Sequence, residues 1–187
     1  MDGLLIVDKP RGVSSFNVIR DVRKKYGIRA VGHIGTLDPE ASGVLPILVG
    51  KATKLSDLLM LHDKDYIAEI TLGIKTDSGD IEGNVIERDD SNHNYDKNQI
   101  LTILNSFKGH SKQIPPMYSA IKIDGKKLYE LARKGECIER KERDIFIENI
   151  ELLDFDGKII KYKVTCSKGT YIRVLSEDIA EKLGTVG

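Results

Sequence analysis

The stretch Gly32-His-Ile-Gly-Thr-Leu-Asp-Pro-Glu-Ala-Ser-Gly-Val-Leu-Pro-Ile-Leu-Val-Gly50 places one acid, Asp38, in a loop next to an apolar run. Its glycines permit turns that other residues resist, and Pro39 pushes Asp38 toward extended backbone. The run Val44 to Val49 predicts a buried strand. The stretch therefore predicts a carboxylate held on a loop beside a strand, where functional side chains often lie. The alternative is an ordinary Asp-Pro turn, in which the carboxylate only caps its own backbone.

Length and composition are typical of a globular protein with a core of its own. The chain has 187 residues, no apolar run of membrane-spanning length and no signal peptide, so a cytoplasmic protein without a membrane partner is expected. The two cysteines, Cys137 and Cys166, show neither a disulfide framework nor metal-ligand spacing, and the four histidines are scattered. We therefore expect reduced thiols, with Cys166 in a buried strand, and no bound metal.

Charge is balanced overall but unevenly distributed. The chain has 29 basic and 29 acidic residues, which by itself argues against a nucleic-acid binder. Residues 20–29 hold five basic side chains against one acid, and residues 122–143 hold eight against five, whereas residues 77–96 hold seven acids against one arginine. This distribution is compatible with a basic side that binds a polyanion. The alternative is a set of ordinary solvated faces.

Apolar periodicity predicts an α+β protein. The predicted strands span residues 3–8, 44–49, 64–73, 118–123, 143–155 and 158–166, the last two forming a hairpin. The predicted helices start at Ser14 or Ser15, Thr53, Asp96, about residue 128 and about residue 172; the third has Ile100, Leu101, Leu104 and Phe107 on its inner face. Residues 73–96 are polar and are expected to form a mobile connection with only a brief strand at Val85-Ile86. Because strands and helices do not alternate regularly, we expect a mixed, mostly antiparallel sheet flanked by helices.

Three glycine-punctuated patches carry candidate functional side chains. They are His33 with Asp38, Tyr66 at the start of a strand, and Arg173 at a strand-to-helix junction. In covalent catalysis Asp38 would be the nucleophile, Arg173 would keep it ionised, and Tyr66 would pack on a planar substrate. Taken singly, each residue is better explained by structure: Tyr66 as an aromatic side chain of a strand in the core, and Arg173 as an ordinary surface residue at the start of a helix.

Six short motifs follow one another along the chain. They are Asp8-Lys-Pro-Arg-Gly-Val-Ser-Ser15, Gly32-His-Ile-Gly-Thr-Leu-Asp-Pro39, Asp63-Lys-Asp-Tyr66, Gln113-Ile-Pro-Pro-Met-Tyr-Ser-Ala120, Leu128-Tyr-Glu-Leu-Ala-Arg-Lys-Gly135 and Cys166-Ser-Lys-Gly-Thr-Tyr-Ile-Arg173. In this order they resemble the TruB family of tRNA pseudouridine synthases, from Gly3 to Gly184. The resemblance implies a pseudouridine synthase-like catalytic domain that isomerises uridine 55 in the T-loop of tRNA without a cofactor.

The resemblance also implies roles for individual residues. The expected catalytic residues are the nucleophile Asp38, its ion-pair partner Arg173, and Tyr66, which stacks on the flipped uracil. The expected substrate-binding and pocket residues are His33, Tyr66, Tyr171, Lys9 and Pro10. Residues 113–140 are similar to the family's RNA-gripping insertion and are expected to be mobile.

The resemblance leaves open how much of the family's domain structure and activity this chain retains. Family members continue beyond the Leu-Gly pair at 183–184, so we expect residues 1–187 to form a single catalytic domain without the C-terminal RNA-binding domain, and to act as a monomer on the T-arm. One alternative is a non-catalytic RNA-binding remnant. Another is a carboxylate-dependent hydrolase, which would need a second acid beside Asp38; Glu40, across Pro39, is poorly placed for that.

Overall fold

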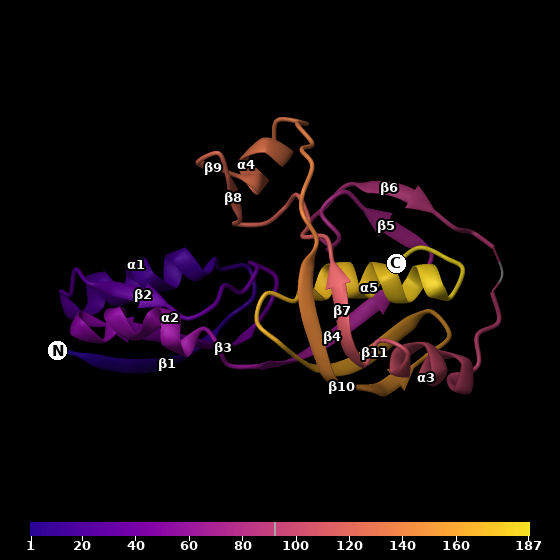
Figure 1. Ribbon diagram of the computed structural model, residues 1–187, viewed down its shortest axis with the longest axis horizontal. Helices are drawn as coiled ribbons and strands as arrows, with labels where there is room; N and C mark the ends of the chain where they lie inside the picture. The colour runs from indigo at the N-terminus through magenta and orange to yellow at the C-terminus, as the bar shows by residue number, and fades with distance from the viewer. Residues whose placement is uncertain (92) are drawn as a thin grey trace. The chain divides into compact units, whose positions relative to one another are not determined.

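The computed structural model describes residues 1–91 and 93–187, which form two compact units, Met1–His62 and Asp63–Gly187 (Figure 1). Each unit has its own hydrophobic core. The single catalytic domain expected for residues 1–187 stays a prediction. None of the helices in the described part of the chain is long and apolar enough to cross a membrane.

The first unit is a small antiparallel sheet with a helix packed on one face. Its elements are β1 (Gly3–Lys9), α1 (Ser15–Tyr26), β2 (Val31–His33), β3 (Gly43–Val49), the 3₁₀ helix η1 (Gly50–Leu55) and α2 (Ser56–Leu59), with strand order β1-β3-β2. The Ser14 side chain accepts a hydrogen bond from the Asn17 amide and so caps α1. The buried face of α1 packs on the inner residues of β2 and β3. The first predicted strand, the first predicted helix and the strand 44–49 are confirmed.

Two local features of this unit differ from the sequence expectation. The strand β2 was not predicted, because three residues that include Gly32 show no strand periodicity. Thr53 does not cap a helix: its hydroxyl donates to the Gly50 carbonyl at 2.8 Å, inside η1, and the helix α2 starts at Ser56. The hydroxyl therefore supports the 3₁₀ turn instead.

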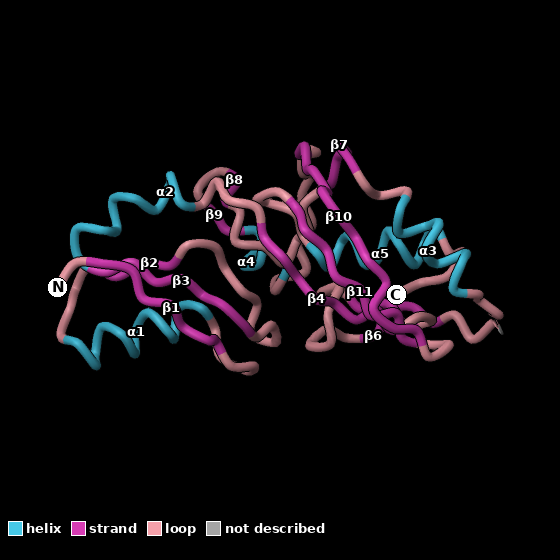
Figure 2. The backbone as a smooth tube through the Cα atoms, turned by 90° about the horizontal axis from the view of Figure 1, so that it is seen from below, coloured by secondary structure: helices cyan, strands magenta, loops and turns pink. Residues whose placement is uncertain are grey.

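The second unit contains a four-stranded antiparallel sheet. Its strands are β4 (Lys64–Thr71), β7 (Gly109–Gln113), β10 (Arg143–Phe155) and β11 (Ile159–Cys166), in the order β4-β11-β10-β7. Figure 2 shows the long strands β10 and β11 running side by side, as the predicted hairpin requires. The helices α3 (Lys97–Asn105) and α5 (Ile172–Lys182) contribute Ile100, Leu104, Leu175 and Ile179 to a core that also buries Tyr162 and Cys166 of β11. The α+β class with antiparallel sheets is confirmed.

The acidic stretch predicted as a mobile connection forms a hairpin. The strands β5 (Ile74–Thr76) and β6 (Val85–Arg88) pair antiparallel. The loop between them closes on its own side chains, because Asp77 accepts hydrogen bonds from the Asn84 amide at 2.9 Å and from its side chain at 3.2 Å. The acidic residues thus satisfy local backbone donors. The brief strand predicted at Val85-Ile86 is confirmed as part of β6, but its pairing with β5 was not predicted. Residue 92 of this stretch lies outside the described residues.

Residues 113–140 contain less strand than predicted. Only Lys122–Ile123 (β8) pairs with Lys126–Lys127 (β9), around a turn in which Asp124 has a φ of 51°, and the helix α4 (Leu128–Ala132) follows. The predicted strand from 118 to 121 is wrong, since a turn with a Ser119–Met117 hydrogen bond follows the two prolines. Leu101 of α3 is exposed rather than inward, and the polar edge strand β7 was missed.

Candidate active site

The loop that carries Asp38 joins β2 to β3 and is anchored on both sides of the acid. On one side the Ser15 hydroxyl accepts a hydrogen bond from the Leu37 amide at 3.0 Å and donates one to the Leu37 carbonyl at 2.9 Å. Ser15 is buried at the start of α1. The helix therefore fixes the backbone directly before Asp38, which is itself half-buried.

On the other side of the acid the loop is held by Lys9, the last residue of β1. Lys9 is fully buried, and its ammonium group donates to the carbonyls of Pro39 at 3.0 Å, Pro10 at 2.9 Å and Val13 at 2.6 Å. Burial lowers the pKa of Lys9, while the negative charges of Glu40 and Asp38 act in the opposite direction. The buried Lys9 ammonium thus lies close enough to the Asp38 loop for the negative charges of that loop to stabilise it. Pro10 is exposed and contributes its carbonyl to this arrangement.

His33 ends β2 at the beginning of the same loop. Its ring nitrogen Nδ1 is hydrogen-bonded to the Gly35 carbonyl, and the side chain is half-buried. Gly35 has a φ of 81°, a conformation that favours glycine. The turn that this glycine permits brings its carbonyl back to the imidazole and fixes the ring.

Arg173 lies in the first turn of α5, and the contacts of its guanidinium are specific. It donates to the Ser78 carbonyl at 2.6 Å and to the Tyr118 carbonyl at 2.8 Å, and it lies 3.6 Å from a carboxylate oxygen of Asp80. Only 15% of the Arg173 side chain is exposed. The planar guanidinium suits several acceptors at fixed angles.

Asp80 is a site residue that the sequence analysis missed. Its carboxylate also accepts hydrogen bonds from the Ser78 hydroxyl at 2.6 Å and from the Glu82 amide at 3.0 Å. The β5–β6 loop therefore holds Asp80 in place against Arg173. The only signal in the sequence was the acid-rich run from 77 to 96, which by itself indicated a solvated loop.

Tyr66 and Tyr171 belong to the second unit, like Arg173. Tyr66 is half-buried on β4 and packs against the hydrophobic core. Tyr171 precedes α5, and its backbone is hydrogen-bonded to the side chain of Gln113. The first unit holds the other expected site residues: Lys9, Pro10, His33 and Asp38. The pairing of Asp38 with Arg173 joins residues of both units and stays a prediction.

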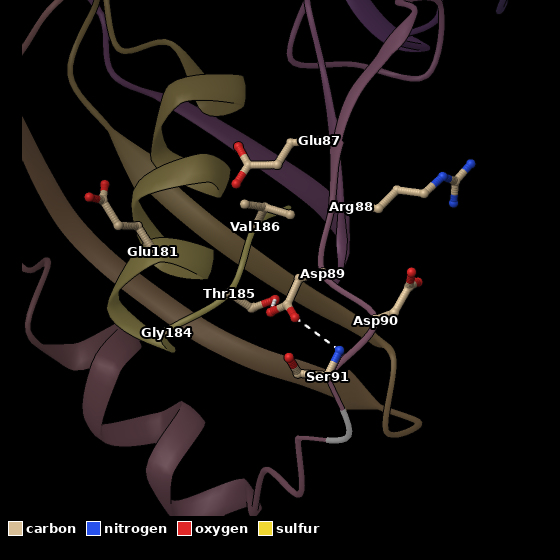
Figure 3. Close-up of a pocket in the computed structure, with 9 residues that line it drawn as sticks. All are labelled: Glu87, Arg88, Asp89, Asp90, Ser91, Glu181, Gly184, Thr185 and Val186. Atoms are coloured by element: carbon tan, nitrogen blue, oxygen red, sulfur yellow. Dashed lines mark hydrogen bonds between the residues drawn. The ribbon is translucent and has the colours of Figure 1, made fainter.

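A separate pocket in the second unit is acidic. Figure 3 shows its lining residues, with Thr185 beside Asp89 and with Arg88 turned away: Glu87, Arg88, Asp89, Asp90, Ser91, Glu181, Gly184, Thr185 and Val186. Asp89 accepts hydrogen bonds from the Thr185 hydroxyl at 2.6 Å, the His93 ring at 2.7 Å and the Ser91 amide at 3.0 Å. These bonds, chiefly that from Thr185, hold the pKa of Asp89 far below its usual value. So many carboxylates repel phosphate, which makes this pocket a poor RNA site.

No set of metal ligands was found in the part of the chain that the structure describes. Within residues 1–91 and 93–187, no group of three or more His, Cys, Asp or Glu side chains is placed to hold a metal ion. The two thiols are free, with Cys166 buried in β11 as expected and Cys137 exposed. Burial raises the pKa of the Cys166 thiol.

Comparisons with known proteins identify the family. A sequence profile described as "TruB family pseudouridylate synthase (N terminal domain)" matches residues 23–172. Proteins named tRNA pseudouridine synthase B are 48% identical in Hydrogenovibrio crunogenus and 51% identical in Alkaliphilus oremlandii, in each case over all of this chain. The chain belongs to the TruB family of pseudouridylate synthases.

The matches also define how much of the relatives the chain represents. It spans 61% of the length of the Hydrogenovibrio protein and 62% of the Alkaliphilus protein. Among solved structures, a chain in the crystal structure of a Cbf5-Nop10-Gar1 complex superimposes with a TM-score of 0.74 at 29% identity, covering 98% of this chain and 45% of that one. The fold of a pseudouridine synthase is therefore shared over nearly the whole chain.

Proposed function

We propose that this chain isomerises uridine to pseudouridine at position 55 in the T-loop of tRNA, with Asp38 as the nucleophile. The observation that carries the proposal is the anchoring of the Asp38 loop. Ser15 and Lys9 fix the residues on either side of the acid, within a chain of the TruB family. Such positioning of a reactive group is the main requirement of a reaction that needs no cofactor.

The proposed reaction exchanges the bond between the ribose and N1 of uracil for a bond between the ribose and C5. The Asp38 carboxylate attacks the target uridine, at the base or at the sugar, and the bond between N1 of uracil and C1′ of ribose breaks. The uracil rotates, a bond forms between its C5 and C1′, the C5 proton leaves, N1 gains a proton, and the carboxylate is released unchanged. The uridine must first leave its stack in the loop.

Two residues of the second unit assist in this scheme. Arg173 pairs with Asp38 and keeps it ionised. Tyr66 stacks on the extruded uracil and takes part in the late proton transfer. His33 and Tyr171 contact the extruded nucleotide.

The basic segment 113–140 is proposed to grip the T-arm. Its exposed basic side chains include Lys122, Lys126, Arg133 and Lys134. The Lys127 ammonium lies 5.3 Å and the Arg133 guanidinium 5.4 Å from the centroid of the Tyr129 ring. Cations beside an aromatic ring suit the phosphates and unstacked bases of an RNA loop. We propose that the chain acts as a monomer in the cytoplasm and that the segment moves when RNA binds.

Product analysis tests this proposal. T-arm RNA is incubated with the chain, digested to nucleosides and separated by chromatography, with the full-length Alkaliphilus relative as a positive control. The proposal predicts pseudouridine from the wild-type chain and none from Asp38→Asn. RNA that binds but stays unmodified would favour the non-catalytic RNA-binding alternative. Free uracil would favour the hydrolase and overturn the isomerase.

A further inference from the structure

Gln113, the first residue of the segment 113–140, connects that segment to the start of α5. It is the last residue of β7, pairs with Arg143 of β10, and is only 4% exposed. Its side-chain amide donates to the Tyr171 carbonyl at 3.1 Å and accepts from the Tyr171 amide at 2.8 Å. One side chain therefore satisfies both backbone groups of the residue that precedes α5.

The residue that Gln113 holds, Tyr171, is the N-cap of α5, a helix that begins without the usual side-chain cap. Tyr171 has extended dihedral angles, with φ −94° and ψ 109°, and its own side chain makes no capping hydrogen bond. Its carbonyl also accepts the first bond of the helix, from the Leu175 amide at 3.1 Å. Gln113 thus fixes the direction in which α5 starts, and Arg173 lies in that first turn.

A second contact joins the same two regions. The Tyr118 carbonyl, five residues beyond Gln113, accepts a hydrogen bond from the Arg173 guanidinium at 2.8 Å. Farther along the segment, the Tyr129 amide donates to the Ser119 carbonyl at 3.1 Å, so α4 is tied to the residue next to Tyr118. Two hydrogen bonds and the peptide link between Tyr118 and Ser119 therefore connect α4 to Arg173.

We infer that Gln113 is a positioning residue that locks Tyr171 and the first turn of α5, and so sets the orientation of Arg173 for catalysis. The expected effect on the catalytic rate rests on the proposed function. The expected effect on the backbone at Tyr171 does not, because the Gln113–Tyr171 bonds exist without RNA. A purely structural glutamine would affect stability and leave the rate per folded molecule unchanged.

Two variants separate these roles. Gln113→Met keeps the volume of the side chain but makes neither bond, so we expect kcat to fall about 10-fold while KM and the Kd for T-arm RNA change less than about 3-fold. Gln113→Glu can accept from the Tyr171 amide, but it can donate to the carbonyl only when its carboxyl is protonated. Burial raises the pKa of such a carboxyl. The kcat of Gln113→Glu relative to wild type should therefore rise as the pH is lowered, while that of Gln113→Met stays low throughout.

The matched control is Gln99→Glu, on an exposed position of α3, which should leave kcat and its pH profile unchanged. Thermal unfolding midpoints and near-UV circular dichroism show whether each variant is folded. An equal kcat for wild type and folded Gln113→Met would overturn the inference, as would a Gln113→Glu ratio that does not change with pH.

A second measurement keeps the inference testable if the wild-type chain itself proves inactive. Amide hydrogen exchange at Tyr171 should be faster in Gln113→Met than in wild type by about 10-fold, whereas amides of α3 should not change. Unchanged exchange at Tyr171 would overturn the inference. Absence of turnover in wild type, with faster exchange in the variant, would instead count against the proposed function alone.

Discussion

The Asp38 loop and the start of α5 each hold a proposed catalytic side chain, but by different means. Around Asp38 the neighbouring backbone is held by hydrogen bonds: Ser15 bonds to Leu37, and Lys9 bonds to the Pro39 carbonyl. At the start of α5 the hydrogen bonds are made by the Arg173 side chain itself: its guanidinium donates to two carbonyls and lies near Asp80. Asp38 is therefore positioned through the backbone on either side of it, whereas Arg173 is positioned by the hydrogen bonds of its own guanidinium.

This difference predicts how each region responds to substitution. In the loop, replacing the acid should remove chemistry without disturbing the fold, because the anchors contact its neighbours. In α5, replacing the arginine should disturb both charge and local geometry, because the guanidinium holds the β5–β6 loop and the Tyr118 carbonyl together. Four substitutions sharpen this comparison.

The largest effect is expected for Asp38→Asn. The amide keeps the shape of the side chain but is not a nucleophile, so turnover should fall by at least ~10⁴-fold. Binding of T-arm RNA, measured by filter retention, should stay within about 3-fold of wild type. Activity that survives the substitution would show that the nucleophile lies elsewhere.

Arg173→Lys should have the next largest effect. An ammonium group cannot bond to the Ser78 and Tyr118 carbonyls with the geometry of a planar guanidinium, so we expect single-turnover rates to fall by ~10²-fold. Lys182→Arg, at the other end of α5, is the matched control and should have a normal rate. A normal rate for Arg173→Lys would mean that only the positive charge matters.

Lys9→Met tests the backbone anchor of the Asp38 loop. The change leaves the carbonyls of Pro10, Val13 and Pro39 without their common buried donor, and we expect a loss of about 2–3 kcal/mol in the free energy of unfolding. Urea denaturation measures this loss, with Lys24→Met on the exposed side of α1 as the control. Equal stability of the two variants would show that the anchor contributes little.

Asp80→Asn should have the smallest effect on the rate. The amide oxygen still accepts from Ser78, but the charge opposite Arg173 is lost, so we expect a decrease of about 10-fold in single-turnover rate. The decrease should be absent when Asp80→Asn is made in an Arg173→Met background, since methionine has no charge on which Asp80 could act. Fully additive effects would contradict that coupling.

Sequence patterns predicted the helices and strands whose apolar periodicity can be recognised within the element itself. The hairpin of β10 and β11 and the helices α1 and α5 have long apolar periodicities and clear ends. The strands β2 and β7 and the β5–β6 hairpin do not, because they are short or polar, and β7 is in addition fixed by pairing with β10, about thirty residues further along the chain.

The candidate site shows the same division. Asp38, Tyr66 and Arg173 were singled out because short motifs surround them, and motif resemblance supplied their proposed roles. Gln113 opens one of the six motifs and Asp80 lies outside them, but neither could be given a role from the sequence, because their partners lie far along the chain: Gln113 contacts Tyr171, 58 residues away, and Asp80 contacts Arg173. Such contacts follow from the packing of the second unit, which no local pattern contains.

The most direct test of the account is tritium release from T-arm RNA labelled at C5 of uracil, since isomerisation must expel the C5 proton. This chain and the full-length Alkaliphilus relative are measured side by side under single-turnover conditions. The account predicts release by both proteins, up to one tritium per target uridine, and none by the Asp38→Asn chain. Release by the relative together with RNA binding but no release by this chain would contradict it, and would leave residues 1–187 as an RNA-binding core.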